Sequence, residues 1–172
     1  MTALSKTCWR FRVDYSTRHW QSWDYCSSGT GLTEEAGAFF QRLELGPVTV
    51  DTSSDYTCAP PADAIRPSQT PGAQWRQSCR GAYTASKGEV TSAGPYTFVG
   101  NEDLTIGGRS VATLHYRRAR TLGGSQSGTE VVDTWFIAAN GLPAKNSRSI
   151  TVHSGSLLGG VTYTERGSFT LS

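Results

Sequence analysis

Hydrolytic chemistry is the first possibility that the residue types of this 172-residue chain raise. A serine nucleophile usually stands at the centre of a Gly-x-Ser-x-Gly turn between a strand and a helix. The nearest string, Gly124-Ser-Gln-Ser-Gly128, has Gln126 at the central position and lies between two expected strands. Both requirements of a serine hydrolase are therefore unmet.

Acidic and histidine side chains could supply two other kinds of site. A glycosidase needs two carboxyl groups that flank the scissile bond, and the available acids are Glu102, Asp103, Glu130 and Asp133. Acidic side chains beside turns are usually solvated, however, which argues against a glycosidase. Zinc sites need His or Cys residues two to four positions apart, whereas the three histidines lie far apart at His19, His115 and His153. A strand histidine, even where His115 and His153 approach across a sheet, is more often a half-buried hydrogen-bonding residue. We predict no catalytic residue, no metal and no cofactor.

The four cysteines are better used in disulfides than as reactive thiols. Folding residues 8–26 as a hairpin about Thr17 places Cys8 opposite Cys26, and the same register places Arg10 opposite Asp24. Large apolar side chains then share the other face. This register predicts a cross-strand disulfide on the more solvated face, and two free buried thiols are the alternative.

Cys58 and Cys79 would form the second disulfide. This bond would tie the base of a Pro-rich loop over residues 59–73, and closing about 20 residues would save about 3 kcal/mol of chain entropy. Other pairings stay open, because four cysteines allow three connectivities.

The aromatic residues give the clearest functional indication. One face of the N-terminal hairpin should carry a patch to which two later tryptophans could add, and these ligand-lining candidates are Trp9, Phe11, Trp23, Trp75 and Trp135. They could pack as a core or line a ligand cleft, because the chain is poor in Leu and Ile. Trp20 falls on the opposite side of the hairpin and is predicted to be exposed, as a contact for sugar or protein.

A run of arginines, Arg117-Arg118-x-Arg120, alternates between the two faces of an expected strand. We expect these side chains to be solvated and to pair with acids such as Asp133 on the next strand. An anion-binding role is the alternative.

Alternating patterns and turn chemistry predict strands along most of the chain. The expected strands are 8–15, 19–26, 38–45, 48–51, 74–83, 95–106, 109–122, 129–138, 142–154 and 161–172. Thr33 could instead cap a short helix before Gly46-Pro47, but Gly37 leaves little room for one. Gly107-Gly108 is a two-residue hairpin turn, and Gly-rich loops are expected over 123–128 and 155–160.

These elements predict an all-β fold: a strongly curved, mostly antiparallel sheet of about nine strands, as a half-barrel or open barrel, with two disulfides. Residues 1–172 would form a single β domain, composed of an N-terminal hairpin and strands (1–58), the Pro-rich loop (59–73) and an antiparallel meander (74–172).

Composition excludes several partners and suggests a compartment. Sixteen basic residues against fourteen acidic ones give a charge of only +2, so nucleic acid is an unsuited partner. No stretch approaches the 18 apolar residues of a transmembrane helix. The cysteines favour an extracellular or cell-envelope location, and the export signal would lie outside this sequence.

Several motifs carry a resemblance. The blocks Ala93-Gly-Pro-Tyr-Thr-Phe-Val-Gly-Asn-Glu, Leu104-Thr-Ile-Gly-Gly, Asp133-Thr-Trp-Phe and Gly160-Val-Thr-Tyr-Thr-Glu resemble uncharacterised secreted or envelope proteins of actinobacteria. The passage through Trp135 and Gly141-Leu-Pro also looks like small antiparallel half-barrel domains of the lipoprotein-carrier type, which hold acyl chains on a concave face. The scarcity of aliphatic residues departs from that type.

We expect a non-catalytic extracytoplasmic binding module for an apolar small molecule, a lipid or an envelope protein. The alternatives are a structural or adhesive module that contacts glycan or protein through exposed aromatics, and a hydrolase without a recognisable motif.

Overall fold

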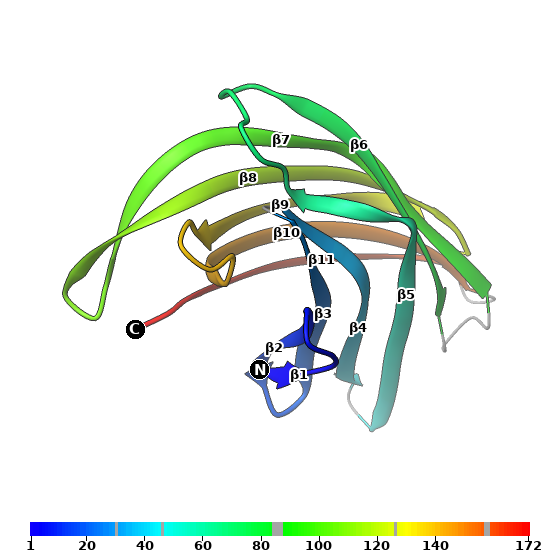
Figure 1. Ribbon diagram of the computed structural model, residues 1–172. Coiled ribbons are helices and arrows are strands. Elements are labelled where there is room, and N and C mark those ends of the chain that lie inside the picture. Colours follow the sequence, from blue (N-terminus) through cyan, green and yellow to red (C-terminus); the bar gives the residue numbers. More distant parts are fainter. Residues whose placement is uncertain (30, 46, 84–87, 126, 157–158) are drawn as a thin grey trace. The chain divides into compact units, whose positions relative to one another are not determined.

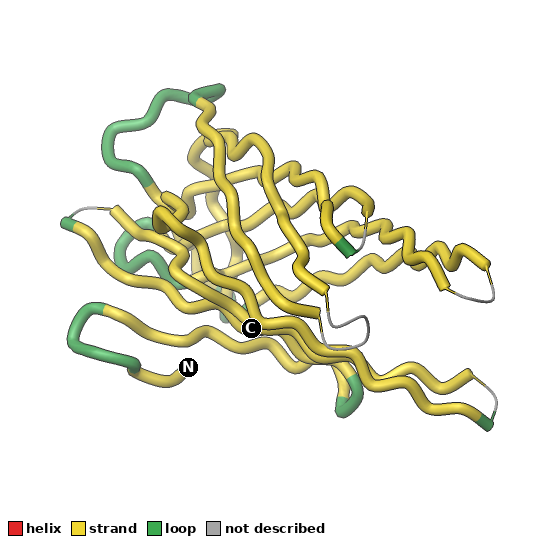
Figure 2. The backbone as a smooth tube through the Cα atoms, turned by 90° about the vertical axis from the view of Figure 1, so that its right-hand side faces the viewer, coloured by secondary structure: helices red, strands yellow, loops and turns green. Residues whose placement is uncertain are grey.

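In the part of the chain that the structure describes, eleven strands form one antiparallel sheet in which each strand follows its predecessor in chain order (Figure 1). The structure is a computed structural model that describes residues 1–29, 31–45, 47–83, 88–125, 127–156 and 159–172, and these residues contain strands and turns but no helix (Figure 2). The strands are β1 Thr2–Ala3, β2 Cys8–Ser16, β3 His19–Ser28, β4 Gly31–Leu45, β5 Val48–Ile65, β6 Gln74–Tyr83, β7 Gly88–Ile106, β8 Arg109–Gly124, β9 Ser127–Ile137, β10 Pro143–Ser156 and β11 Gly159–Thr170.

The all-β class, the antiparallel pairing and the two disulfides are confirmed, but the expected number of about nine strands is wrong. The two-residue strand β1 is too short to leave a pattern in the sequence. The chain divides into two compact units. The first unit comprises 1–67, 78–92 and 123–125, and the second comprises 68–77, 93–122 and 126–172.

The β2–β3 hairpin of the first unit has the register that the sequence predicts. Cys8 lies opposite Cys26, and the pairing continues without interruption to Asp14 opposite Trp20. The cysteines form a disulfide with a Cα–Cα distance of 4.0 Å, and Arg10 donates to both carboxylate oxygens of Asp24, at 2.7 and 2.8 Å. Three alternating apolar positions on the other face specified this pairing.

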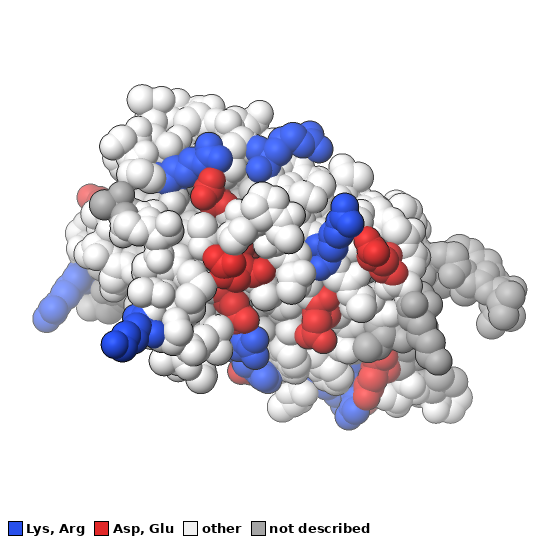
Figure 3. All heavy atoms as spheres, turned by 45° about the vertical axis from the view of Figure 1, so that its right-hand side comes forward, with Lys and Arg blue, Asp and Glu red and all other residues white. Residues whose placement is uncertain are grey.

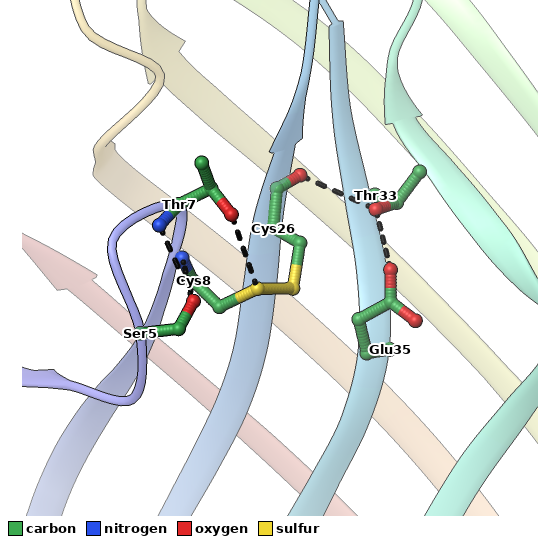
Figure 4. Close-up of a disulfide and its surroundings, with 6 residues drawn as sticks. All are labelled: Ser5, Thr7, Cys8, Cys26, Thr33 and Glu35. Carbon is green, nitrogen blue, oxygen red and sulfur yellow. Dashed lines mark hydrogen bonds between the residues drawn. A yellow bond between two sulfur atoms is a disulfide. The ribbon is translucent and has the colours of Figure 1, made fainter.

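Hydrogen bonds flank this disulfide on both sides (Figure 4). The Ser5 hydroxyl oxygen accepts from the backbone N–H groups of Thr7 and Cys8, at 3.2 and 3.1 Å. On the next strand the Thr33 hydroxyl lies 3.2 Å from the carbonyl oxygen of Cys26 and 2.6 Å from a Glu35 carboxylate oxygen. The β2 end is thereby held in place where it enters the sheet.

Residues 38–45 form a strand, as preferred from the sequence, and this strand is part of β4, which begins earlier, at Gly31. The predicted loop over 59–73 is wrong in part, because β5 continues to Ile65 and the loop spans only 66–73. Opposite the prolines the register shifts: Glu34 pairs with Ala62 and Ala36 with Thr57. Pro60 and Pro61 therefore lie in a bulge, where a missing backbone N–H breaks no ladder hydrogen bond.

Gly37 of β4 lies directly opposite Tyr56 of β5. A β-carbon at Gly37 would collide with the Tyr56 phenol ring and with the Ser22 carbonyl oxygen. The tyrosine thus covers the glycine and donates from its hydroxyl to the buried Glu34 carboxylate at 2.9 Å. Only a residue without a side chain fits beneath that ring.

We expect Gly37→Ala to lower the free energy of unfolding by about 1–3 kcal/mol, because the new methyl group overpacks this site. Urea unfolding followed by tryptophan fluorescence measures the change. The control is Gly123→Ala, whose new methyl would meet only the Thr91 hydroxyl, at 3.0 Å. Equal effects of the two substitutions would contradict the close packing of Tyr56 on Gly37.

The second unit contains the long, curved strands β8 to β11 and most of β7 (Figure 1). Their bounds follow the predicted meander closely, although β7 begins at Gly88, seven residues before the expected Pro95. Gly107 and Gly108 have φ angles of 55° and 75°, which a two-residue turn of type I′ requires. The expected loops over 123–128 and 155–160 lie partly outside the described residues, and their remaining residues extend β8 to β11 or, at Ser125, form a bend.

Candidate functional site

Five aromatic side chains pack together on one face of the second unit. We call them the aromatic cluster: Trp75, Tyr96, Phe98, Tyr116 and Phe136. Each is at most 8% exposed. Tyr116 is central, with ring-centroid distances of 5.0 Å to Phe98, 5.4 Å to Tyr96 and 6.0 Å to Trp75. Rings from β6, β7, β8 and β9 thus form one continuous, buried apolar layer.

Charged side chains continue this same face along β8. Tyr116, Arg118 and Arg120 alternate along an unbroken register, so their side chains point to one face of the sheet. Across the neighbouring strands Arg118 lies opposite Val132, which lies opposite Arg148. All three arginines are buried, with 4–9% of their surface exposed. The expectation that Arg118 and Arg120 are solvated is therefore wrong, because their side chains share the inward face of Tyr116.

Glu130 is the acid that balances these arginines. We call Arg118, Arg120, Arg148 and Glu130 the guanidinium cluster. Glu130 accepts from Arg148 Nε at 2.9 Å and forms an ion pair with Arg118 at 3.2 Å. Burial disfavours the ionised carboxylate, but the charges of the three arginines outweigh burial and lower the pKa of Glu130 to about 2. The carboxylate is ionised throughout the physiological range.

Arg148 and Asn146 each have a buried side-chain atom without a hydrogen-bond partner. One is Nη1 of Arg148, which approaches Glu165 Oε1 only to 3.9 Å, and the other is Oδ1 of Asn146. Asn146 does use its Nδ2 group, which donates to the Thr134 hydroxyl at 3.0 Å. Buried polar groups in native proteins are nearly always satisfied by protein, water or ligand. Both atoms therefore retain the capacity for a further hydrogen bond.

A different set of polar side chains gathers on the opposite face of the same strands. His115 lies between Tyr116 and Leu114 in sequence, so it points away from the aromatic cluster. Its Nδ1 is 2.7 Å from Glu102 Oε1, and its Nε2 is 2.8 Å from Asp133 Oδ1. The Trp135 ring stacks on the imidazole at 4.1 Å and its indole N–H donates to Glu102 at 2.7 Å.

The carboxylates around His115 have hydrogen-bonding or charged partners within the same group of side chains. The hydrogen bond from Trp135 lowers the pKa of Glu102, against the opposing effect of burial, and the hydrogen bond with His115 adds to this lowering. Arg117 donates to both oxygens of Asp133, at 2.9 and 3.1 Å, which confirms the predicted pairing with that acid. Lys145 places its ammonium 4.3 Å from the Trp135 ring centroid.

Glu102 and Asp133 do not form the carboxylate pair of a glycosidase. The His115 ring occupies the space between them, so a glycosidic oxygen would have to displace the imidazole. The other two acids lie elsewhere: Glu130 points to the opposite face of the sheet, and Asp103 is exposed. His153 contacts Thr162 at 3.0 Å. The network is suited to holding β7, β8 and β9 together.

The predicted aromatic patch is divided among different places. Trp75 joins the aromatic cluster, whereas Trp135 stacks on His115 on the opposite face, so the expectation that both line one surface is wrong. Trp9, Phe11 and Trp23 belong to the first unit, where the Phe11 and Trp23 rings lie 6.2 Å apart. Trp23 is buried, and Trp9 and Phe11 are half-buried.

Trp20 is half-buried rather than exposed. The Arg12 guanidinium lies 4.2 Å from its ring centroid, and Phe40 stacks on it at 6.1 Å. A sugar that stacked on the ring face covered by Arg12 would have to displace the guanidinium. The face shown in Figure 3 carries both basic and acidic side chains, with a group of acidic side chains near its centre.

Sequence reasoning missed most of the residues in the two clusters. Tyr96, Phe98, Tyr116 and Phe136 lie at alternate positions of predicted strands, and the spacing of Tyr116, Arg118 and Arg120 already places them on one face. The role of Arg148 had no such signal, because it depends on the register between β9 and β10.

Comparisons with protein-family models, with curated proteins and with solved structures find no match to this chain. The resemblance to actinobacterial envelope proteins therefore stays a prediction. Among the described residues, no helix has the length and apolar character needed to span a membrane.

Proposed function

We propose that this protein is a non-catalytic extracytoplasmic module that binds a small molecule with an apolar body and a polar end. The observation that carries the proposal is the continuity of the aromatic cluster with unsatisfied buried polar atoms of Arg148 and Asn146. A purely structural core would gain nothing from a buried guanidinium N–H without an acceptor. A ligand that lies along this face would cover rings at one end and meet polar groups at the other.

The two disulfides support the extracytoplasmic part of the proposal. All four cysteines are oxidised in pairs, Cys8 with Cys26 and Cys58 with Cys79. Disulfides persist in secreted and envelope proteins and are rare in reducing compartments.

Calorimetric titration with 1-decanol, a probe with a ten-carbon chain and a neutral head, tests the apolar part of the site. We expect saturable binding that Phe98→Leu weakens about fivefold, because leucine fills much of the same volume but loses the ring contact with Tyr116. The control is Phe11→Leu in the first unit, which should leave the affinity unchanged.

Absence of binding by decyl compounds with either a neutral or an anionic head would overturn the proposed function. An equal loss of affinity in the Phe98 and Phe11 variants would place the site away from the aromatic cluster.

A further inference from the structure

The polar end of the proposed site gathers three positive charges. Three buried guanidinium groups, Arg118, Arg120 and Arg148, face the carboxylate of Glu130 and, more distantly, that of Glu165. Arg120 also donates from Nη2 to Gln77 Oε1 at 2.7 Å, which is a neutral acceptor. Buried cations are costly unless anions compensate them. A bound anion would add its negative charge to the compensation that Glu130 and Glu165 supply.

The position of Arg148 makes it the group most suited to receive that charge. Its Nε is held by Glu130 at 2.9 Å, which fixes the plane of the guanidinium. Its Nη1 is buried and makes no hydrogen bond, although it is 3.9 Å from Glu165. An oriented guanidinium with a free N–H group is a ready partner for a carboxylate or phosphate oxygen.

The aromatic cluster begins one cross-strand row away from Arg148. Arg148 is in the row of Arg118 and Val132, and the adjacent row contains Tyr116, Thr134 and Asn146. Successive side chains on one face of a strand are about 7 Å apart. A ligand whose head group is bound to Arg148 would therefore extend past Asn146 before its apolar part reaches Tyr116. The unsatisfied Oδ1 of Asn146 can accept a hydrogen bond from a hydroxyl or amide N–H group of such a ligand.

We propose that Arg148, supported by Arg118 across Val132, binds the carboxylate or phosphate group of a single-chain amphiphile whose apolar part lies on the aromatic cluster. This inference rests on the proposed function and specifies its ligand class. The head group supplies the acceptor that Nη1 lacks, and Glu130 holds the guanidinium ready for it.

Titration of the unmodified protein with matched ten-carbon probes at pH 8 tests the charge requirement. Decanoate and decyl phosphate should bind at least tenfold more tightly than 1-decanol. Inorganic phosphate and acetate should bind far more weakly than the decyl compounds. Equal affinities for decanol and decanoate would overturn the anion site while leaving the proposed function intact, and no binding of any decyl probe would overturn both.

If inorganic phosphate bound as tightly as decyl phosphate, the site would be one for a free oxyanion. That result would contradict the proposal that the ligand is an amphiphile. The two sources of a phosphate group are thereby separated.

Substitution of Arg148 locates the charge. Arg148→Gln should weaken decanoate binding about tenfold and leave decanol binding unchanged. Arg148→Lys keeps the charge but loses the planar fork, so its affinity for decanoate should lie between those of the unmodified protein and the Gln variant. Arg166→Gln, at an exposed position of β11, is the control. Unchanged decanoate affinity in both Arg148 variants would overturn the assignment of the head group to Arg148.

Discussion

Replacing Glu130 with alanine should lower the free energy of unfolding by about 3–5 kcal/mol, because the change leaves three buried arginines without their shared counter-ion. Glu130 is 6% exposed and contacts Arg118 and Arg148 directly. Urea unfolding at pH 7 measures the loss. The cost arises mainly from the charges left behind, so it should exceed that of any exposed ion pair.

Acid should weaken the protein through the same residue. The folded-state pKa of Glu130 is about 2, below its ordinary value of 4.5. Its contribution to stability is therefore complete above about pH 4.5 and is lost as the pH falls toward 2. A shift of this size corresponds to about 3 kcal/mol.

An exposed pair provides the control for both measurements. Arg18 donates to Glu44 at 2.7 Å, with about half of each side chain exposed, and Glu44→Ala should cost less than about 1 kcal/mol. Between pH 4.5 and 2, the free energy of unfolding of the Glu130→Ala variant should also fall less than that of the unmodified protein, because the variant lacks the carboxyl group that becomes protonated. Similar costs for the two substitutions would mean that the buried arginines are compensated by other groups.

Removing the Cys58–Cys79 disulfide as Cys58→Ala/Cys79→Ala should cost about 3–5 kcal/mol. Loop-closure entropy accounts for about 3 kcal/mol at a separation of 21 residues. The remainder comes from packing, because both sulfurs are buried in a small cluster with Ala62 and Tyr56. Thermal and urea unfolding under non-reducing conditions measure the change.

The other disulfide is a matched control for chain entropy. Cys8 and Cys26 are separated by 18 residues, so the loop term differs by only about 0.1 kcal/mol. Both residues are half-buried, and Cys8→Ala/Cys26→Ala should therefore cost about 1 kcal/mol less than the Cys58/Cys79 variant. A larger cost for the outer pair would show that packing around Cys58 and Cys79 contributes little.

Local pairing was predictable from the sequence because short-range patterns determine it. The register from Cys8–Cys26 to Val13–Gln21 follows from alternation within 19 residues, and the Gly107-Gly108 turn follows from backbone freedom at positive φ. Both disulfides required only that neighbouring strands pair. The continuation of β5 through Pro60 and Pro61 was missed, because the bulge opposite Glu35 depends on the partner strand.

The candidate site depended on relations that a single strand does not reveal. Alternation places Tyr116 and Arg118 on one face, but only the combined registers of β8, β9 and β10 place Arg148 beside them. Trp75 and Trp135 similarly occupy opposite faces, although nothing within either strand indicates it. Sequence composition suggested a role for aromatic side chains. The buried arginines and Glu130 of the candidate site were recognised only from the pairing of the strands in the sheet.

Consecutive pairing of the cysteines has a consequence for oxidative folding. The first cysteine joins the second, and the third joins the fourth. A chain that enters an oxidising compartment with its N-terminus first presents Cys26 to Cys8 before Cys58 has emerged. In such a chain each thiol would meet its native partner before any competitor, and we expect the native one of the three connectivities to form with little reshuffling.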